Sequence, residues 1–459
     1  MPPTSQAPTK APELLRELGV GQASAIVVGT IIGSGIFLVP AEMMQAVGSA
    51  RLVYLAWIVG GLLSLAGAIT YAELGAMKPQ AGGEYVYIRD AYGPLTAFLY
   101  AWTWFIVAKP GSVATIATGI VRILGTFPAL AFFSDTAFSS PMKLTYGQLV
   151  AIAAAILITW LNYVGVKRAG EFQLVFTVLK IVMIVGVAIV GFTAASGTWR
   201  NFSTHFAGTT GGVAGFMAAL VAALWAYDGW MDLTFAGSEI IEPQKNIPRA
   251  LVGGTMTVGV IYLLANAVYF RVLPMEAVAS AQNAASEAVR VFAGARAAAW
   301  ITAAMVLSAF TTLNSSVLTG SRVPFAMARD GLFFQVANGI HSRYRTPAGA
   351  IVFQASISCL MVLTGQFEDL FSLFIFAQWI FYGLSVASVY GSRHKEPDLV
   401  RPYRAWGYPV VPAIFVAGAF ALTVNLFIQR PIRSSIGLLL ILAGLPFYRY
   451  WTQGLATNA

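Results

Sequence analysis

Residues 20–47 form a long apolar run that is interrupted near its middle by Gly33, Ser34 and Gly35. A run of this length can cross a lipid bilayer as a helix. A helix that is broken inside lipid leaves backbone N–H and C=O groups without partners, and this is tolerated only where protein, water or a ligand pairs with them. The interruption therefore predicts a binding site near the centre of a membrane.

The composition places the chain among integral membrane proteins. Hydrophobic residues make up 58% of the chain and charged residues only 10%, and the mean hydropathy is +0.72. Soluble domains carry about 25% charged residues. Apolar runs of roughly 18 residues or more predict twelve transmembrane helices, at residues 20–47, 52–76, 94–124, 145–164, 172–195, 211–238, 248–272, 297–326, 347–364, 370–391, 409–429 and 433–451.

Charged residues predict the orientation of these helices. The segment before the first run is polar, with Lys10, Glu13, Arg16 and Glu17, and the run itself is too long for a cleavable signal peptide. With the N-terminus inside the cell, most of the 28 Lys and Arg residues fall on the cytoplasmic side, as the positive-inside rule requires. We therefore expect a multi-pass protein of the cell membrane with both termini in the cytoplasm.

Several partner classes are disfavoured. Basic residues are dispersed over short loops, so the net charge of +9 reflects membrane topology and we expect no nucleic-acid partner. The single cysteine, Cys359, cannot form an intramolecular disulfide. The three histidines, His205, His341 and His394, lie outside the expected helices, and the loops carry no enzyme motif. We expect no metal, no other cofactor and no enzymatic activity.

A second interruption lies five expected helices after the first. The stretch Trp225-Ala-Tyr-Asp-Gly-Trp230 places an acid and a glycine inside the membrane. Matching broken helices in two halves of a chain indicate an inverted-repeat transporter with its substrate site near the bilayer midplane. We expect an all-α membrane protein in which five helices, five inverted helices and two additional helices follow one another. The expected units are a cytoplasmic segment at 1–18, a first repeat at 19–195, a second repeat at 211–392 and a final helix pair at 405–451.

The two breaks predict a cradle for a zwitterion. A half-helix that begins near Ser34 would direct free N–H groups and its positive dipole end at a carboxylate. Carbonyls near Ile31 and Ile32, and at Trp225 and Asp228, would accept from an ammonium group. The alternative is that the glycines only allow close helix packing. The candidate substrate-binding residues are Ile31, Gly33, Ser34, Gly35, Trp225, Ala226 and Asp228.

Lys180 lies in an apolar sequence, too deep in its expected helix for easy contact with water. A charge at the bilayer centre costs about 2.5–3.5 kcal/mol on insertion scales, and such residues are functional candidates. Oxygens should surround it, and the eighth expected helix offers Ser308, Thr311, Thr312 and Asn314. We interpret Lys180, Ser308 and Thr312 as a site where an ammonium group replaces a bound sodium ion. A structural lysine that reaches the membrane surface, or a proton carrier, remains the alternative.

Acidic residues follow the second break. Asp228 and Asp232 are four residues apart and share a face if the backbone there is helical. Asp228 either contacts a cationic substrate side chain or caps the second half-helix. For Glu239 and Glu242, beside Lys245 and Arg249, we expect local ion pairs. The roles of Lys109, inside the third expected helix, and of Asp232 are left open.

Aromatic residues near the breaks are candidates for gates that close over the substrate. These candidates are Trp225, Phe376 and Trp379.

At these residues the chain resembles the amino acid–polyamine–organocation superfamily and, within it, the L-type amino acid transporters, which are the light subunits of heteromeric transporters, and their bacterial relatives. The resemblance extends from about Gly19 to Tyr450. It rests on Val28-Gly-Thr-Ile-Ile-Gly-Ser-Gly-Ile-Phe37, Tyr71-Ala-Glu-Leu-Gly75, Gly82-Gly-Glu-Tyr85, Ala91-Tyr-Gly-Pro94, Trp225-Ala-Tyr-Asp-Gly-Trp230, Asn246-Ile-Pro-Arg249, Phe376-Ala-Gln-Trp379 and Arg401-Pro-Tyr403.

The resemblance implies sodium-independent amino acid transport by alternating access, commonly as exchange. It implies that Ser34 and Gly35 bind the substrate carboxylate, and that Ile31, Trp225 and Asp228 offer carbonyls to the α-amino group. Trp225 would also gate the site from outside. Lys180 matches the lysine that stands where sodium binds in sodium-coupled relatives. The Tyr-Asp-Gly-Trp variant resembles members that accept cationic as well as neutral amino acids.

The chain also departs from the family pattern. Met231, Asp232 and Ser238 differ from the usual residues, so the resemblance does not transfer side-chain selectivity. The loop around Gly125 to Lys143 lacks the cysteine that joins eukaryotic light subunits to a heavy chain, so we expect a bacterial-type protein without a disulfide-linked heavy chain. Alternative functions are proton-coupled uptake of amino acids or polyamines, with Lys180 or Asp228 as the proton carrier, and a membrane amino acid sensor that does not transport.

Overall fold

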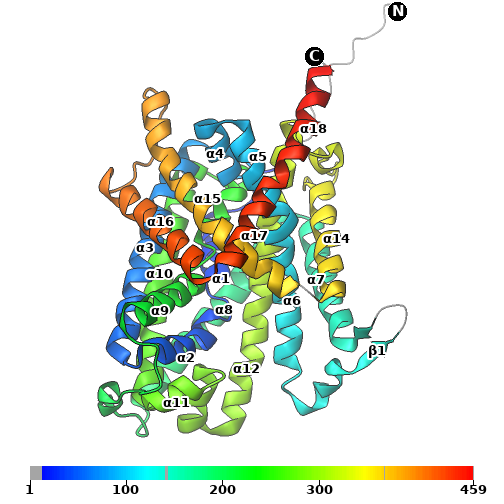
Figure 1. Cartoon of the computed structure of the whole chain (residues 1–459). Coiled ribbons are helices and arrows are strands. Elements are labelled where there is room, and N and C mark those ends of the chain that lie inside the picture. Colours follow the sequence, from blue (N-terminus) through cyan, green and yellow to red (C-terminus); the bar gives the residue numbers. More distant parts are fainter. Residues whose placement is uncertain (1–12, 140–142, 366, 458–459) are drawn as a thin grey trace, which may run out of the picture.

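The structure is a computed structural model that describes residues 13–139, 143–365 and 367–457. Within these residues the chain is almost entirely helical, and the long helices run side by side in one bundle (Figure 1). Most of the expected N-terminal segment, residues 1–12, lies outside the described residues.

The first part of the chain runs from α1 to α8. Its elements are α1 Val20–Ile31, α2 Gly35–Val47, α3 Ala50–Met77, α4 Glu84–Tyr92, α5 Pro94–Thr103, the π-helix η1 Trp104–Ala108, α6 Lys109–Leu124, the 3-10 helix η2 Pro128–Ser134, β1 Thr136–Phe138, β2 Leu144–Thr145, α7 Tyr146–Tyr163 and α8 Val166–Thr193. The two short strands pair antiparallel.

The second part of the chain runs from η3 to α18. Its elements are the 3-10 helix η3 Trp199–Ser203, α9 Gly212–Ala226, the 3-10 helices η4 Trp230–Phe235 and η5 Gly237–Glu239, α10 Pro243–Val272, α11 Met275–Ser280, α12 Ala284–Gly320, α13 Arg322–Arg329, the 3-10 helix η6 Gln335–Asn338, α14 Ala348–Thr364, α15 Phe367–Lys395, α16 Val410–Gln429, α17 Pro431–Leu442 and α18 Gly444–Thr457.

Ten helical segments of the described chain are long and apolar enough to cross a membrane. They are Val20–Val47, Ala50–Met77, Pro94–Leu124, Tyr146–Tyr163, Val166–Thr193, Gly212–Phe235, Pro243–Val272, Ala284–Arg329, Val410–Gln429 and Pro431–Gln453. The shorter apolar helix α14 and the helix α15, of 29 residues, lie where the two remaining spans were expected. The inverted arrangement of five and five helices stays a prediction.

Both expected breaks are present. The first helix stops at Ile31 and resumes as α2 at Gly35, and α9 stops at Ala226 before η4 begins at Trp230. Gly229 adopts a left-handed φ of 105°, and a Cβ atom there would lie 2.5 Å from Cγ2 of Thr30. Only glycine fits this conformation and this space. The second break is therefore placed directly against the first helix.

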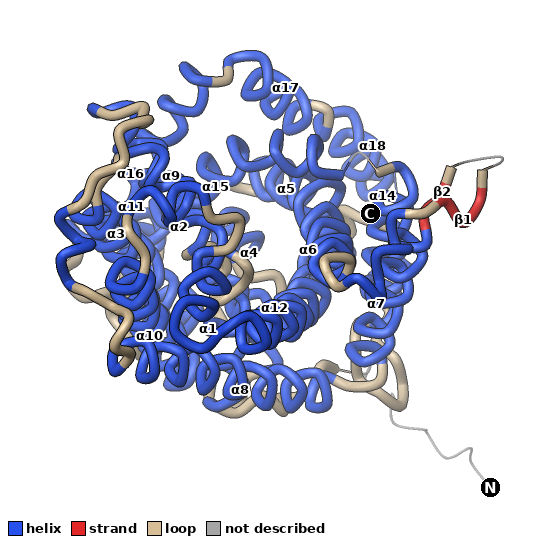
Figure 2. The backbone as a smooth tube through the Cα atoms, turned by 90° about the horizontal axis from the view of Figure 1, so that it is seen from below, coloured by secondary structure: helices blue, strands red, loops and turns tan. Residues whose placement is uncertain are grey.

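The interrupted first helix is enclosed by other helices. Seen along the bundle, α1 lies between α8, α10 and α12 (Figure 2), and each of these three helices contacts it. This position explains why the break is tolerated, because protein groups surround the freed backbone groups.

Backbone hydrogen bonds join separate segments at the end of the bundle that carries α4, which lies opposite α11 (Figure 1). The N–H groups of Glu17 and Leu18 donate to the carbonyl of Glu239, at 3.0 and 2.9 Å, and Leu18 forms a parallel bridge with Ile240. A second bridge joins Ala81 to Ala236. The segments before α1, before α4 and after η4 are thus tied together by backbone hydrogen bonds.

A buried ion pair reinforces this end of the bundle. Glu239 accepts from Nε and Nη2 of Arg322, both at 2.8 Å, and both side chains are 0% exposed. The expectation of a local partner for Glu239 is wrong, because η5 directs this side chain towards the start of α13. The expectation is confirmed for Glu242, which pairs with Lys245 at 3.3 Å on the surface.

Replacing Glu239 with Gln leaves the buried Arg322 guanidinium without its counterion, and breaking such a pair costs about 3–5 kcal/mol of unfolding free energy. Glu242→Gln breaks only an exposed pair, for which we expect a loss of less than about 1 kcal/mol. Thermal unfolding of both purified variants in detergent measures the difference. Equal midpoints for the two variants would contradict the stabilising role of the buried pair.

Candidate functional site

The first break exposes backbone donors. Among the described residues, the N–H groups of Ser34 and Gly35 have no backbone hydrogen-bond partner, as is usual at the first turn of a helix. The N–H of Gly33 is not free, because it donates to the carbonyl of Ile31 at 2.8 Å. The start of α2 therefore presents two donors and a positive dipole end, which together suit an anion.

One tyrosine hydroxyl connects the two breaks. Tyr262, which is 0% exposed on α10, contacts the carbonyl oxygens of Ile31 at 2.8 Å and Ala226 at 2.9 Å. A hydroxyl has a single proton for these two acceptors, so acceptor capacity remains for a further donor such as an ammonium group. The sequence-based prediction missed this residue. One feature of the sequence could have pointed to Tyr262: it lies deep in an apolar run, away from the membrane interfaces where tyrosine is usual.

The two breaks also touch directly. A Cβ atom on Gly35 would lie 2.9 Å from Cβ and 3.0 Å from Cα of Ala226, and 3.6 Å from the ring of Trp225. The candidate residues of the two helices, far apart in sequence, therefore form one site.

Lys180 binds the carbonyls that the first break frees. Its Nζ donates to the carbonyl oxygens of Gly29 at 2.9 Å and Ile32 at 2.7 Å and lies 3.4 Å from Oγ of Ser308. The side chain is 1% exposed. The hydroxyl of Ser308 also donates to Ile32, at 2.9 Å, and that of Thr312 to Gly29, at 3.4 Å. The side chains of Lys180 on α8 and of Ser308 and Thr312 on α12 thus meet at the end of α1, as expected.

Three details of this region differ from expectation. The carbonyl of Ile32 is already bound by Lys180 and Ser308, so it is not an acceptor for a substrate. Thr311 donates to the backbone of its own helix. Asn314 bonds to Asn162, Gln173 and the carbonyl of Ala169, and not to Lys180.

A polar stripe on α8 holds α8 against α1. Gln173 and Thr177 both contact the carbonyl of Ala25, at 3.2 and 3.3 Å, and they lie about two turns and about one turn before Lys180, respectively. A Cβ atom on Gly29 would lie 2.2 Å from Nε2 of Gln173, which shows how closely the two helices approach. The spacing of Gln173, Thr177 and Lys180 on one helical face was a signal in the sequence that the prediction did not use.

Asp228 is bound by α15. Its carboxylate accepts from the hydroxyl of Tyr382 at 2.8 Å and from Nε2 of Gln378 at 3.1 and 3.2 Å. Among the described residues, no N–H group of η4 donates to this side chain, so the structure does not show the capping role. The carboxylate is half-buried beside the break. Gln378 belongs to a motif noted in the sequence, but its contact with Asp228 was not foreseen.

The side chain of Asp232 has different partners from that of Asp228. It pairs with Nζ of Lys109 at 2.6 Å and accepts from the hydroxyl of Thr319 at 3.0 Å, and Lys109 lies over the ring of Trp104, 4.9 Å from its centroid. Asp228 and Asp232 do not share a face, because the helical backbone on which that expectation depended is absent: η4 is a 3-10 helix that starts only after the left-handed Gly229. The pair also supplies the partner of Lys109 that the sequence left open.

The three candidate gates differ in their surroundings. Trp225 lies beside Gly35 and is 46% exposed. The ring of Trp379 lies 5.8 Å from that of Tyr382, which binds Asp228. Phe376 is buried and its ring lies 6.0 Å from that of Phe427 on α16. Two of the three therefore adjoin the site, and the ring of Phe376 packs towards the neighbouring helix.

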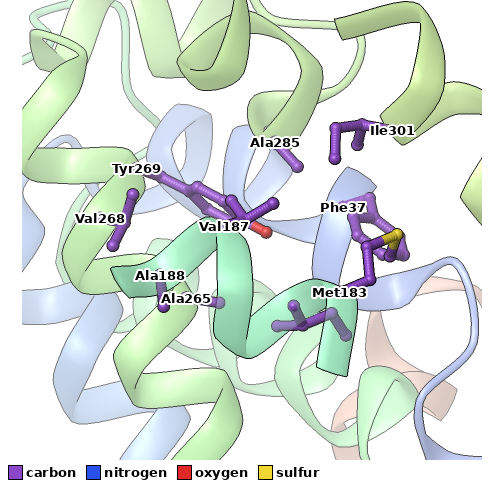
Figure 3. A pocket seen from close by; sticks show the side chains of 10 residues that line it. Phe37, Met183, Val187, Ala188, Ala265, Val268, Tyr269, Ala285 and Ile301 are labelled. Atoms are coloured by element: carbon purple, nitrogen blue, oxygen red, sulfur yellow. The ribbon is translucent and has the colours of Figure 1, made fainter. Parts of the chain in front are cut away.

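A separate pocket lies beside α2. Its walls come from α2, α8, α10 and α12 and are almost wholly apolar (Figure 3). None of the candidate substrate-binding residues lines it. A zwitterion needs paired polar groups when it leaves water, so this pocket does not suit one. The lining residues are Phe37, Met183, Ile184, Val187, Ala188, Ala265, Val268, Tyr269, Ala285 and Ile301.

Known proteins with similar sequences are transporters of amino acids. The family model of amino acid permeases matches residues 18–447. The chain is 34% identical over 454 residues to b(0,+)-type amino acid transporter 1 of Mus musculus, which covers 97% of this chain and 90% of that protein. It is 31% identical over 440 residues to the serine/threonine exchanger SteT of Bacillus subtilis, with 95% and 96% covered. It is 33% identical over 450 residues to the large neutral amino acids transporter small subunit 2 of Homo sapiens, with 95% and 81% covered.

Matches of this extent reach both broken helices and the residues that connect them. The chain therefore belongs to the amino acid permease family, among its L-type amino acid transporters, and it is a transporter and not an enzyme.

Proposed function

We propose that this chain is a sodium-independent exchanger of L-amino acids that works by alternating access. The observation that carries the proposal is the ammonium group of Lys180 on the carbonyls of Gly29 and Ile32. Carbonyls freed at a break in a membrane helix are the groups that coordinate sodium in coupled transporters. A fixed ammonium at that position supplies the positive charge permanently, so no ion has to bind with the substrate.

The substrate is bound as a zwitterion between the two breaks. Its carboxylate receives hydrogen bonds from the N–H groups of Ser34 and Gly35, where the dipole of α2 adds attraction. Its ammonium group donates to the carbonyls of Ile31, Trp225 and Ala226. Gly33 leaves the approach to the backbone open, and Gly35 allows the close contact with Ala226.

The chain has twelve transmembrane helices, with repeats at 19–195 and 211–392 and a final pair at 405–451. The end that carries α4 faces the cytoplasm, as do both termini, and the protein lies in the cell membrane. The backbone bridges at Leu18 and Ala81 close this end. Because Trp225 is 46% exposed, we assign the structure to a state of the transport cycle in which the site is closed to the cytoplasm and accessible from outside. In the next step of the transport cycle, Trp225, Phe376 and Trp379 close over the bound substrate.

The substrate class follows from Asp228. Its half-buried carboxylate is held by Tyr382 and Gln378 beside the break, where a substrate side chain would extend. A charged hydrogen bond to a cationic side chain is stronger than a neutral contact, so we include cationic amino acids beside neutral ones. The b(0,+)-type relatives and the serine/threonine exchanger are consistent with exchange of amino acids. The chain acts without a disulfide-linked heavy chain.

Transport should not depend on sodium. Replacing sodium with choline in a liposome exchange assay should leave the rate unchanged, and Lys180→Ala should lower it at least about tenfold, because charged hydrogen bonds of about 1.5–3 kcal/mol are lost. Lys167→Ala, an exposed lysine on the same helix, serves as the control and should keep the wild-type rate. A rate that collapses without sodium would show that Lys180 does not replace the ion.

Gly35→Val should abolish substrate binding, because the added side chain would clash with Ala226 and displace the start of α2, whose N–H groups bind the carboxylate. Gly119→Val on α6, where a Cβ atom would meet nothing within 4 Å, is the matched control. Amino acid methyl esters, which lack the anion, should compete poorly in the same binding assay. Equal competition by leucine and its methyl ester would argue that the start of α2 does not bind a carboxylate.

Asp228→Asn should weaken the inhibition constant of arginine by about 10- to 100-fold, since a hydrogen bond to a charged group contributes about 1.5–3 kcal/mol. The constant for leucine should change little. Asp398→Asn, an exposed acid, is the control and should change neither constant. If arginine and leucine weaken together in Asp228→Asn, the carboxylate has a structural role and the substrates are neutral amino acids.

A further inference from the structure

Exposed cations that the proposed function does not use lie at the end of the bundle where α7 meets α8. The helix α7 ends at Tyr163 and α8 begins at Val166, and both helices are long and apolar enough to cross a membrane. The turn between them and the first turn of α8 therefore lie at the surface of the bilayer. Lys167 and Arg168 occupy that first turn, and both are exposed.

A loop from a distant part of the chain is fixed against this turn. The hydroxyl of Thr346, just before α14, donates to the carbonyl of Tyr163 at 2.9 Å. The rings of His341 and Tyr344 lie 5.4 and 6.0 Å from the ring of Tyr163. The helix α7 also packs against both α14 and α8. The loop before α14 is thus held at the same membrane surface as the start of α8.

This loop brings two more cations. Nδ1 of His341 accepts from the N–H groups of Arg343 and Tyr344, at 3.1 and 3.2 Å. The N–H of Arg345 donates to the carbonyl of His341 at 2.9 Å. The guanidinium group of Arg343 lies over the ring of Tyr344, 5.5 Å from its centroid. The loop is therefore a compact turn in which Arg343 is exposed and Arg345 is partly exposed.

The positive charge of the two segments is not balanced by acids. We name their four cations the basic corner: Lys167, Arg168, Arg343 and Arg345. Among the described residues, none of the four is part of an ion pair. Residues 160–175 and 338–352 are all described, and they contain one acid, the exposed Glu171. Four positive charges thus stand against one negative charge, and such a surface attracts phosphate groups.

The helices next to the basic corner expose apolar faces of the kind that lipid chains cover. Val175 and Leu179 lie about two and three turns after Arg168 on the same face of α8, and each is more than half exposed. Trp160, one turn before the end of α7, is also more than half exposed, and tryptophan is typical of the boundary between headgroups and acyl chains. A ligand with a negative headgroup and apolar chains matches both parts of this surface, whereas a free anion matches only the first.

We propose that the basic corner binds the headgroup of an anionic phospholipid whose acyl chains lie along the exposed faces of α7 and α8. Arg168 and Arg343 contact the phosphate from the two segments, because a guanidinium group presents a planar fork of donors that matches phosphate. The positive-inside rule accounts for basic loops in general, but not for cations of two distant segments that meet beside exposed apolar faces. This inference goes beyond the proposed function and does not depend on the substrate.

Lipid binding to the purified full-length protein in a neutral detergent tests the proposal. Dioctanoyl phosphatidylglycerol is titrated, and the dissociation constant is taken from the rise of the thermal unfolding midpoint. Dioctanoyl phosphatidylcholine, with the same chains and no net charge, is the reference ligand. The wild-type protein should bind the anionic lipid at least about tenfold more tightly, and potassium chloride should reduce this preference by screening the exposed charges. Equal affinities for the two lipids would overturn the proposal, and this measurement needs no variant.

Variants locate the site. Arg168→Gln and Arg343→Gln, one from each segment, should each weaken the binding of phosphatidylglycerol about fivefold, and the double variant should lose most of the preference. Arg404→Gln removes an exposed arginine before α16, which lies on the opposite side of the bundle from α7 and α14 (Figure 2). This control should bind the lipid as the wild-type protein does. A loss in Arg404→Gln as large as in the other two variants would show that the net charge attracts the lipid, and the proposal would be wrong.

Inorganic phosphate distinguishes a lipid site from a site for a free anion. At the concentration at which phosphatidylglycerol saturates the wild-type protein, inorganic phosphate should leave the unfolding midpoint unchanged, because it cannot cover the apolar faces of α7 and α8. A rise as large as that with phosphatidylglycerol, lost in Arg168→Gln, would assign the basic corner to a free anion and refute the lipid site.

Discussion

The site depends on the ammonium group of Lys180. A break in a membrane helix frees carbonyls that lipid cannot pair, and here the carbonyls of Gly29 and Ile32 receive a buried cation. The charge would be expensive to bury alone. Its cost is offset because the same contacts fix the end of α1 against α8 and α12. With the carbonyl side of the break fixed in this way, the N–H groups on the other side stay free for a ligand.

The second broken helix is positioned by the first. Tyr262 contacts one carbonyl from each break, and Gly35 touches Ala226. A movement of either half-helix therefore alters contacts of the other. After the second break, Asp232 forms a buried ion pair with Lys109, and Glu239 forms one with Arg322. The segment that follows the second break is thus also the segment that backbone bridges tie to the α4 end of the bundle.

The sequence was enough to locate both breaks and Lys180, because charged residues and helix-breaking glycines are costly inside a membrane and stand out in apolar runs. It predicted Ser308 as a partner of Lys180 but not the carbonyl partners, since backbone groups leave no mark in a sequence. The pairing of Lys109 with Asp232 was out of reach, because it depends on the left-handed Gly229 and on the 3-10 form of η4. Buried long-range pairs of this kind are set by tertiary structure, so sequence spacing does not show them.

The most direct test is an experimental structure of the protein with a bound amino acid in sodium-containing buffer. We predict that the substrate carboxylate lies within hydrogen-bond distance of the N–H groups of Ser34 and Gly35, with Nζ of Lys180 still on the carbonyls of Gly29 and Ile32. A sodium ion bound to those carbonyls, or a carboxylate bound away from the start of α2, would contradict the account.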